Sequence, residues 1–281
     1  MTALGSVRSC GVTTLALGLA ATWPAERRVL VVEADPAGGT LAAASGWPAE
    51  PSLVSLAAAT RRGGEPALIW EHCHQLPGGT SVLAAPALGE QARSAVGMLG
   101  PLFARLSELD SDVLIDCGRL GPRSSGLGLW ERAHRRILVS RPRLADLQAL
   151  ASWLEGHQPH AEIELVTVGD GPYAEAEIAD TLGLEVLYRL PWDPDGAEAL
   201  VSMPASVRQL RMAPLVRSAR TLADELTAER GRASSARVDV APPAEASRSG
   251  RGLAIGSRVF RAWRTDTRPH SNGSVPEEAA R

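Results

Sequence analysis

The sequence predicts an α/β domain with a doubly wound, mostly parallel sheet that is flanked by helices. Short apolar runs alternate with helical patterns over roughly the first 220 residues, and such alternation is typical of strands joined by crossover helices. Runs such as "VLVV" and "VLI" are uninterrupted by polar residues, as expected for strands that are covered on both faces. With 281 residues, 44% of them hydrophobic, the chain is long and apolar enough to bury a substantial core.

The predicted strands are short runs rich in Val, Leu and Ile. In chain order they cover Thr2–Ser6, Arg28–Glu33, Thr80–Ala84, Asp112–Asp116, Arg136–Ser140, Ile163–Val168 and Leu184–Leu190. The predicted helices lie between or after these strands and cover Thr13–Thr22, Leu53–Arg62, Leu88–Leu109, Arg143–Glu155, Tyr173–Leu182 and Ser206–Glu229. Because ligands of such sheets bind at the carboxyl ends of the strands, the loops that follow the strands are the first place to look for chemistry.

The N-terminal segment has two interpretations. Arg8 followed by "VTTLALGLAATWPA" resembles a secretory signal peptide, but the same residues also fit a strand, a Gly-bearing loop and a first helix. The next run, "RRVLVVEADP", is typical of a buried parallel strand ending in acids, which favours the second interpretation. No run reaches the roughly 18 apolar residues of a membrane span. With only three cysteines, widely spaced, the chain is expected to be cytoplasmic.

Charge is distributed unevenly along the chain. The formal net charge is −3, yet acids outnumber arginines before residue 230 and arginines outnumber acids after it. All 29 basic residues are arginine, a composition typical of a GC-rich genome. The absence of lysine means that no step here can use a lysine ammonium of this chain.

The sequence divides into a domain over residues 1–229 and a basic tail over residues 230–281, which lacks periodicity and is expected to be disordered. Within the tail, residues 251–264 place Leu, Ile, Val, Phe and Trp on one side of a helix and arginines on the other. This segment is expected to bind a membrane surface or a protein partner. The alternative is chance patterning, since Gly252 and Gly256 disfavour a helix. No sequence-specific nucleic-acid signature is present.

Residues suited to phosphate and metal chemistry follow three of the predicted strands. They are the loop "GSVRSCGVTT", the acids of "EADP" at 33–36, and Asp116. Acids placed there would hold Mg²⁺ and orient water against bound phosphates, although such acids also commonly cap helices and turns. His72-Cys73-His74 has no second ligand pair at a zinc-like spacing, so a solvated turn is expected there instead of a metal site.

These motifs resemble the ParA/MinD family of P-loop ATPases over about residues 1 to 228. "VRSCGVTT" lines up with the family's loop KGGVGKTT, "VLVVEADPAGG" with VLLxDxDPQG, and "DVLIDCG" with the Walker B strand. "GLEVLYRLPWDPDGAEAL" is similar to the family's late strand and its proline turn beside the adenine. The resemblance implies a P-loop fold and a site for ATP or ADP with Mg²⁺.

The resemblance also implies roles for individual residues. Asp35 would help to position the attacking water, with Glu33 in the place of the first acid of that motif. Asp116 would act on Mg²⁺ through water, and Thr13 would ligate the ion with its hydroxyl. The remaining positions that match nucleotide-binding residues of the family are Gly11, Thr14 and Pro191.

The loop departs from the family at its lysines. Val7 stands at the signature lysine and Val12 at the lysine that reaches the β- and γ-phosphates, while Arg8 and Ser9 replace two glycines. Without these lysines the charge that offsets the triphosphate and the transition state is missing. Arg8 is the nearest substitute, since guanidinium binds phosphate, but it is offset by four residues from the lost loop lysine.

We therefore expect a regulatory or scaffolding pseudo-ATPase of chromosome-partitioning and positioning ancestry, with weak or absent hydrolysis. It would form a homodimer, or a heterodimer with an intact paralogue. The alternative is an active, dimerising ATPase that uses Arg8 or a basic residue of its partner. A different enzyme on a doubly wound sheet has little support, because the chain has no GxSxG elbow and no GxGxxG after a strand.

Overall fold

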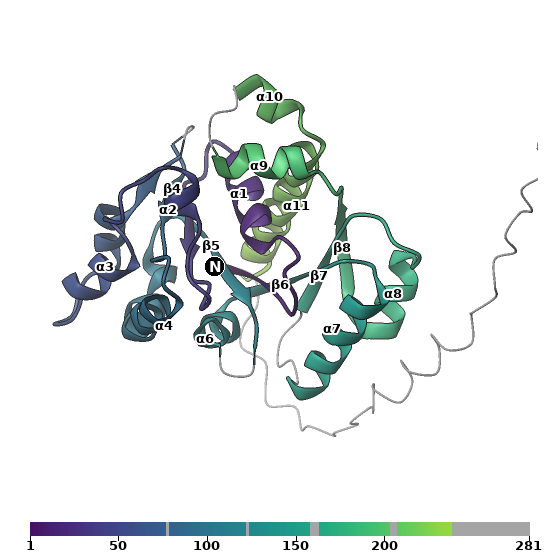
Figure 1. Ribbon diagram of the computed structural model, residues 1–281, viewed down its shortest axis with the longest axis horizontal. Coiled ribbons are helices and arrows are strands. Elements are labelled where there is room, and N and C mark those ends of the chain that lie inside the picture. The colour runs from purple at the N-terminus through teal and green to yellow at the C-terminus, as the bar shows by residue number, and fades with distance from the viewer. Residues whose placement is uncertain (77–78, 122–123, 158–162, 203–206, 238–281) are drawn as a thin grey trace, which may run out of the picture.

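The computed structural model describes residues 1–76, 79–121, 124–157, 163–202 and 207–237 (Figure 1). These residues form an eight-stranded sheet with the order β3-β4-β2-β5-β1-β6-β7-β8. All neighbouring strands are parallel except β3 and β4. The strands are β1 Thr2–Ser6, β2 Val29–Glu33, β3 His74–Gln75, β4 Ser81–Leu83, β5 Asp112–Arg119, β6 Arg135–Ser140, β7 Ile163–Val168 and β8 Glu185–Leu190. The predicted α/β fold with a doubly wound, mostly parallel sheet is thus confirmed.

Helices cover both faces of this sheet. The α-helices are α1 Val12–Thr22, α2 Leu41–Ala44, α3 Leu53–Ala59, α4 Gly89–Met98, α5 Gly100–Phe103, α6 Ser125–Arg132, α7 Leu144–Gly156, α8 Glu175–Leu182, α9 Pro194–Ser202, α10 Val207–Met212 and α11 Pro214–Arg237. Two 3₁₀ helices, η1 Pro66–His72 and η2 Leu106–Glu108, complete the described elements. Figure 1 shows α3, α4, α6, α7 and α8 on one side of the sheet and α1, α9 and α11 on the other.

The core consists of two apolar layers separated by the sheet. Successive residues of the central strands alternate between the layers: Ala3 of β1 belongs to the layer under α3, α4 and α6, while Leu4 belongs to the layer under α1 and α11. This alternation follows from the two-residue period of a strand. Burial on both faces explains why the strands are apolar without interruption.

The register of the central strands brings their carboxyl ends together. Leu4 of β1 and Glu33 of β2 are both paired with Asp116 of β5. The loop after β1, the acids after β2 and the end of β5 therefore meet at one edge of the sheet, as parallel pairing requires.

Several predicted boundaries were wrong for identifiable reasons. The single helix predicted over Leu88–Leu109 is broken into α4, α5 and η2, with Pro101 in the first turn of α5. The helix predicted over Ser206–Glu229 is divided before Pro214, which begins α11. Proline cannot continue a preceding helix, because it lacks the backbone N–H and clashes with the turn before it. Helices α6 and α9 and strand β3 lie where no element was predicted.

Helix α11 continues to Arg237, beyond the boundary predicted at residue 229. The rest of the predicted basic tail, including the segment 251–264, lies outside the described residues. Among the helices that the structure describes, none is both long enough and apolar enough to cross a membrane.

Gly5, near the end of β1, lies in close contact with a neighbouring side chain. A Cβ atom at this position would come within 2.6 Å of Cδ1 of Leu120, which follows β5. At Gly97, on the exposed face of α4, an added Cβ would meet nothing within 4 Å. Substitution of Gly5 therefore tests the packing at the carboxyl end of β1, and substitution of Gly97 is the matched control.

We expect Gly5→Ala to lower the free energy of unfolding by about 1–3 kcal/mol, because the core would be overpacked. We expect Gly97→Ala to raise it by about 0.5–1 kcal/mol, because alanine favours a helix interior. Urea denaturation of the two variants measures both changes. Equal stabilities of Gly5→Ala and the wild type would contradict the close packing at the end of β1.

Candidate functional site

The loop between β1 and α1 keeps a backbone conformation that suits an anion. Gly11 has φ +90°, a left-handed conformation that glycine adopts readily. It is the N-cap of α1, and no side chain caps the helix or places an acid in its first turn. The first turn of α1 therefore contributes no carboxylate of its own that would neutralise the partial positive charge of this helix N-terminus.

The valines at the two lysine positions are packed against the core. Val12, the first residue of α1, is only 5% exposed and belongs to the same apolar layer as Leu15 and Leu19. Val7 is half-buried and packs against the opposite layer. Cys10, between them, is buried, and burial raises the pKa of its thiol. The loop residues thus contribute apolar contacts where the family resemblance implies ammonium groups.

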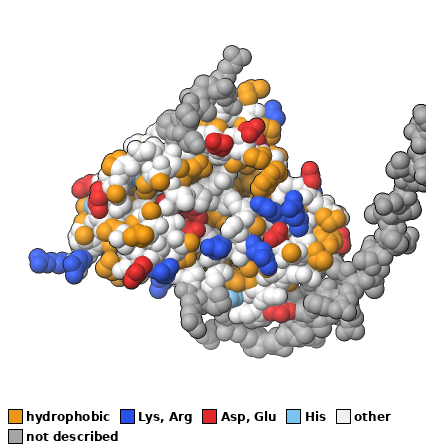
Figure 2. Space-filling model, viewed as in Figure 1, with side chains coloured by type: hydrophobic (Ala, Val, Ile, Leu, Met, Phe, Trp, Pro, Cys, Tyr) orange, Lys and Arg blue, Asp and Glu red, His pale blue; other side chains and the backbone are white. Residues whose placement is uncertain are grey.

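Arg8 lies apart from the other predicted nucleotide-binding residues. Its side chain is 58% exposed, and its Nε lies 3.9 Å from Oδ1 of Asp146 on α7. It lines a shallow surface hollow with Val7, Ser9 and Arg119. Basic side chains gather near the middle of the face seen in Figure 2, and all of them are arginines because the chain contains no lysine.

Thr13 and Asp116 are in direct contact. The Thr13 hydroxyl donates a hydrogen bond to Oδ2 of Asp116 at 2.5 Å, and the amide of Gly118 donates to Oδ1 at 2.9 Å. Asp116 is fully buried, and burial raises the pKa of its carboxyl to about 7 despite these two hydrogen bonds. Of the described residues, no arginine forms an ion pair with Asp116. A threonine hydroxyl beside a carboxylate fits Mg²⁺, which prefers oxygen ligands.

Glu33 holds the surrounding backbone in place. Its carboxylate accepts hydrogen bonds from the amides of Thr40 at 2.7 Å, Leu41 at 3.2 Å and Ala85 at 3.0 Å. The side chain is buried, and burial raises its pKa. Glu33 thereby joins the end of β2 to α2 and to the residues after β4. All three of these bonds use backbone donors, so its observed role is to position the loops.

Asp35 is more accessible than Glu33 and Asp116. Its Oδ1 accepts a hydrogen bond from the amide of Ala37 at 2.8 Å, which closes a turn after β2. Its carboxylate lies over Gly118, where an added Cβ would collide with Cγ of Asp35. Asp35 lines an open depression together with Arg93 and Arg119. Asp35 therefore contacts Gly118, whose amide binds Asp116, and it faces an open depression instead of the protein interior.

A separate cavity of about 260 Å³ brings together the other predicted nucleotide-binding residues. Gly11, Thr14 and Pro191 line it from the first loop, α1 and the end of β8. Its remaining lining residues are Cys10, Leu15, Arg141, Val168, Leu190, Trp192, Asp193, Pro194, Ala197 and Leu215. The cavity is mostly apolar and lies at the carboxyl ends of the strands, where such sheets bind ligands.

Arg141 and Trp192 are among the lining residues of this cavity that were not predicted from the sequence. Arg141 directly follows β6, and its guanidinium carbon lies 4.4 Å from the ring centroid of Trp192. Trp192 directly follows Pro191 and is 59% exposed. Both residues lie just after a strand, which could have marked them as candidate site residues. Their contact with each other could not be predicted, because it depends on the order of the strands in the sheet.

The described histidines, cysteines and acids form no conventional metal cluster. Among the described residues, no group of three or more His, Cys, Asp or Glu side chains is placed to hold a metal ion. In His72-Cys73-His74 the side chains have separate partners: His72 contacts the Ser55 hydroxyl, Cys73 donates to a backbone carbonyl, and His74 stacks on Trp47. The predicted solvated turn was wrong, because these residues join η1 to β3 and His74 is buried.

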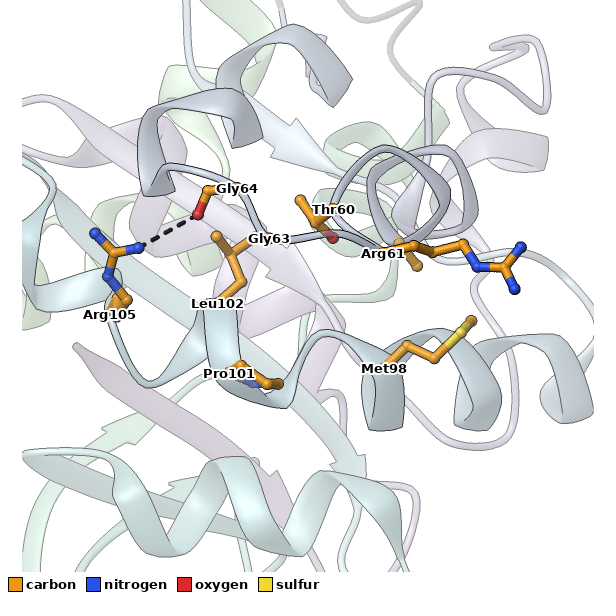
Figure 3. Close-up of a pocket in the computed structure, with 9 residues that line it drawn as sticks. Thr60, Arg61, Gly63, Gly64, Met98, Pro101, Leu102 and Arg105 are labelled. Atoms are coloured by element: carbon orange, nitrogen blue, oxygen red, sulfur yellow. Dashed lines mark hydrogen bonds between the residues drawn. The ribbon is translucent and has the colours of Figure 1, made fainter.

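Another pocket lies away from the predicted site residues. Figure 3 shows it between the end of α3 and the α4–α5 segment, with a volume of about 470 Å³. Arg105 donates a hydrogen bond to the Gly64 carbonyl at 3.3 Å across one end of it, and also pairs with Glu65 and Glu108. None of the predicted site residues lines this pocket.

Comparison with solved structures identifies the architecture. A ParA family ATPase from Chlorobium tepidum TLS superposes with a TM-score of 0.66 over 79% of this chain and 96% of that chain, at 18% identity. This chain has the ParA/MinD fold. The septum site-determining protein MinD complexed with Mg-ADP, from Pyrococcus horikoshii OT3, gives a TM-score of 0.63 at 19% identity, over 83% of this chain and 98% of that one.

A variant of McdA from Cyanothece in complex with ATP also shares the ParA/MinD fold, with a TM-score of 0.55 and 16% identity over 80% of this chain and 95% of that chain. No protein-family model matches the sequence, and no curated protein sequence matches it significantly. The likeness is therefore carried by the three-dimensional arrangement of the strands and helices.

The buried carboxyl of Asp116 predicts a pH-dependent stability. Its pKa is about 7 in the folded protein against an ordinary value of 3.8, so the folded state binds more protons between these values. The free energy of unfolding should therefore fall as the pH rises from about 4 to about 7 and then level off. Asp116→Asn should flatten this dependence by on the order of 2 kcal/mol. Urea denaturation at pH 5 and pH 8, with EDTA present, measures the free energy of unfolding of both proteins. An equal change between the two pH values in the wild type and in Asp116→Asn would contradict the prediction.

Proposed function

We propose that this chain is a regulatory or scaffolding pseudo-ATPase derived from ParA/MinD-like partitioning and positioning ATPases, with weak or absent ATP hydrolysis. One observation carries the proposal: Val12, at the position of the loop lysine, is 5% exposed and packed into the core. A valine there cannot donate a hydrogen bond or offset phosphate charge. No residue anywhere in the chain is a lysine that could replace it.

The loss of charge bears directly on phosphoryl transfer. Catalysis of this reaction depends mainly on positioning and on cations that stabilise charge on the transferred group. Arg8, the nearest basic residue in the loop, lies toward Asp146 and is largely exposed. Asp35 follows β2 and could orient a water molecule. Without a cation in the loop, however, the phosphoryl group that this water would attack is not activated.

Weak nucleotide binding is part of the proposal. Gly11, Thr14 and Pro191 line one cavity, and the N-terminus of α1 adjoins it. Thr13 and Asp116 would hold Mg²⁺ that accompanies a bound ATP or ADP, and the ion would neutralise part of the phosphate charge. These retained features favour the alternative, an active dimerising ATPase in which Arg8 or a partner's basic residue replaces the missing lysine.

A hydrolysis assay separates the two functions. We expect the purified wild type, Asp35→Ala and Arg8→Met to release phosphate from MgATP at the same background rate. The reason is that the loop supplies no cation to stabilise the developing charge. Saturable turnover in the wild type that falls at least tenfold in Asp35→Ala would contradict the pseudo-ATPase proposal. If the wild type does turn over ATP and Arg8→Met also lowers this rate, Arg8 is the substitute cation.

We also propose that the protein acts as a homodimer, or as a heterodimer with a paralogue that retains the lysines. It would be cytoplasmic, and residues 251–264 would bind a membrane surface or a protein partner. The support is the amphipathic pattern of that segment, with arginines opposite its apolar side chains.

Membrane attachment can be measured by vesicle sedimentation. We expect the full chain to sediment with vesicles containing anionic lipid, and a variant that ends at residue 237, where α11 ends, to lose this binding. Neutral vesicles serve as the control, because arginines need anionic headgroups. Unchanged sedimentation of the shortened chain would contradict a role for the tail.

A further inference from the structure

Arg141 is the basic side chain of the cavity that holds Gly11, Thr14 and Pro191. Among the described residues lining this cavity, it alone is basic. Its Nε atom is buried, and within the described part of the chain this atom has no hydrogen-bond partner. A buried donor without a partner is costly, which points to a group that is bound when the protein works.

The acid that lines the same cavity accepts a backbone hydrogen bond at each of its two oxygens. Asp193 accepts hydrogen bonds from the amide of Gly196 at 2.9 Å through Oδ1 and from the amide of Leu215 at 3.1 Å through Oδ2. It fixes the start of α9 and the start of α11. No ion pair between Asp193 and Arg141 occurs among the described residues. Asp193 therefore does not neutralise the positive charge of Arg141.

Trp192 gives the cavity an exposed aromatic surface. It is 59% exposed although it adjoins an apolar cavity, and the guanidinium of Arg141 lies over its ring at 4.4 Å. Gly169, which follows β7, approaches closely enough that an added Cβ would lie 3.2 Å from Cβ of Trp192. The β7 loop thus contacts the base of the Trp192 side chain. Arg141 covers part of the indole, and the exposed part of the ring offers a surface on which a planar group can stack.

The cavity combines three features that suit one kind of ligand. Its apolar walls and Trp192 suit a planar ring, whereas Arg141 and the N-terminus of α1 suit an anionic group. Its volume of about 260 Å³ is just below that of most ligand pockets, which run from about 300 to 1,000 Å³. It therefore has room for a ring system and adjacent groups, but not for an extended chain of phosphates as well.

We infer that Arg141, rather than Arg8, is the cation that contacts the phosphate of a nucleotide in this cavity, and that Trp192 is the surface on which the nucleotide's ring stacks. The inference rests on the proposed retention of a nucleotide site and names the residues that give it its selectivity. Affinity comes from the ring and the nearest phosphates. The γ-phosphate adds little, because Val7 and Val12 supply no basic side chain at its position.

Calorimetric titration of the full chain with adenosine, AMP, ADP and ATP, each with Mg²⁺, tests this assignment. We expect ADP to bind at least tenfold more tightly than adenosine, and ATP to bind within threefold of ADP. Arg141→Met should weaken ADP binding about tenfold and remove most of the difference between ADP and adenosine, while Arg141→Lys should restore part of it. Arg8→Met is the matched control, and its ADP affinity should stay within twofold of the wild type.

A second pair of variants tests the stacking surface. Trp192→Ala should weaken adenosine and ADP by similar factors of about ten, since stacking does not depend on phosphate. Trp70→Ala is the matched control, because Trp70 also lies under an arginine, Arg28 at 3.7 Å, but does not line the cavity. Circular dichroism of each variant establishes that it is folded before its affinity is compared.

The outcomes distinguish this inference from the proposed function. If Arg141→Met leaves ADP affinity unchanged, or Arg8→Met causes the same loss, Arg141 is not the cation. If the wild type binds none of the four probes, the inference fails together with the proposed weak nucleotide binding, while the proposed loss of hydrolysis stands. If the wild type hydrolyses ATP with a rate that depends on Asp35, the proposed function fails, and the ADP affinities of the arginine variants still decide the role of Arg141.

Discussion

The buried carboxylate of Asp116 joins the parts of the molecule that define its candidate site. It ends the run of apolar residues in β5, accepts the hydroxyl of Thr13 from α1, and accepts the amide of Gly118 from the end of its own strand. Its backbone carbonyl accepts the amide of Ala34 from the segment after β2. A polar group at 0% exposure must be satisfied by such contacts, and these contacts fix the relative positions of the first loop, β2 and β5.

Near Asp116, residues of similar type have different surroundings. Glu33 and Asp35 are two residues apart, yet Glu33 is enclosed by backbone amides and Asp35 faces an open depression. Arg8 and Arg141 both follow central strands, yet Arg8 points toward a carboxylate at the surface and Arg141 lines a cavity. Burial and partners, rather than residue type, separate structural groups from those available to a ligand.

The sequence was sufficient for the sheet and its central strands because their apolar runs are continuous and alternate with helices. It also predicted that Thr13, Asp35 and Asp116 would lie at one edge of the sheet, since parallel strands end together. It did not predict the breaks at Pro101 and Pro214 inside otherwise helical patterns. The cavity of Arg141 and Trp192 could not be predicted for a different reason. It forms because β6, β7 and β8 follow β1 in that order across the sheet, and local periodicity does not reveal the order of strands.

The packing of Val12 has a consequence for how this loop can change over evolutionary time. Burying a valine contributes roughly 1.5–3 kcal/mol, so the residue at the place of an ammonium now supports the folded state. A single change to lysine would have to place a charged group in the apolar layer beneath α1 or turn it outward at the cost of those contacts. Because the apolar layer is packed around valine, introducing a lysine into this loop would require several coordinated changes.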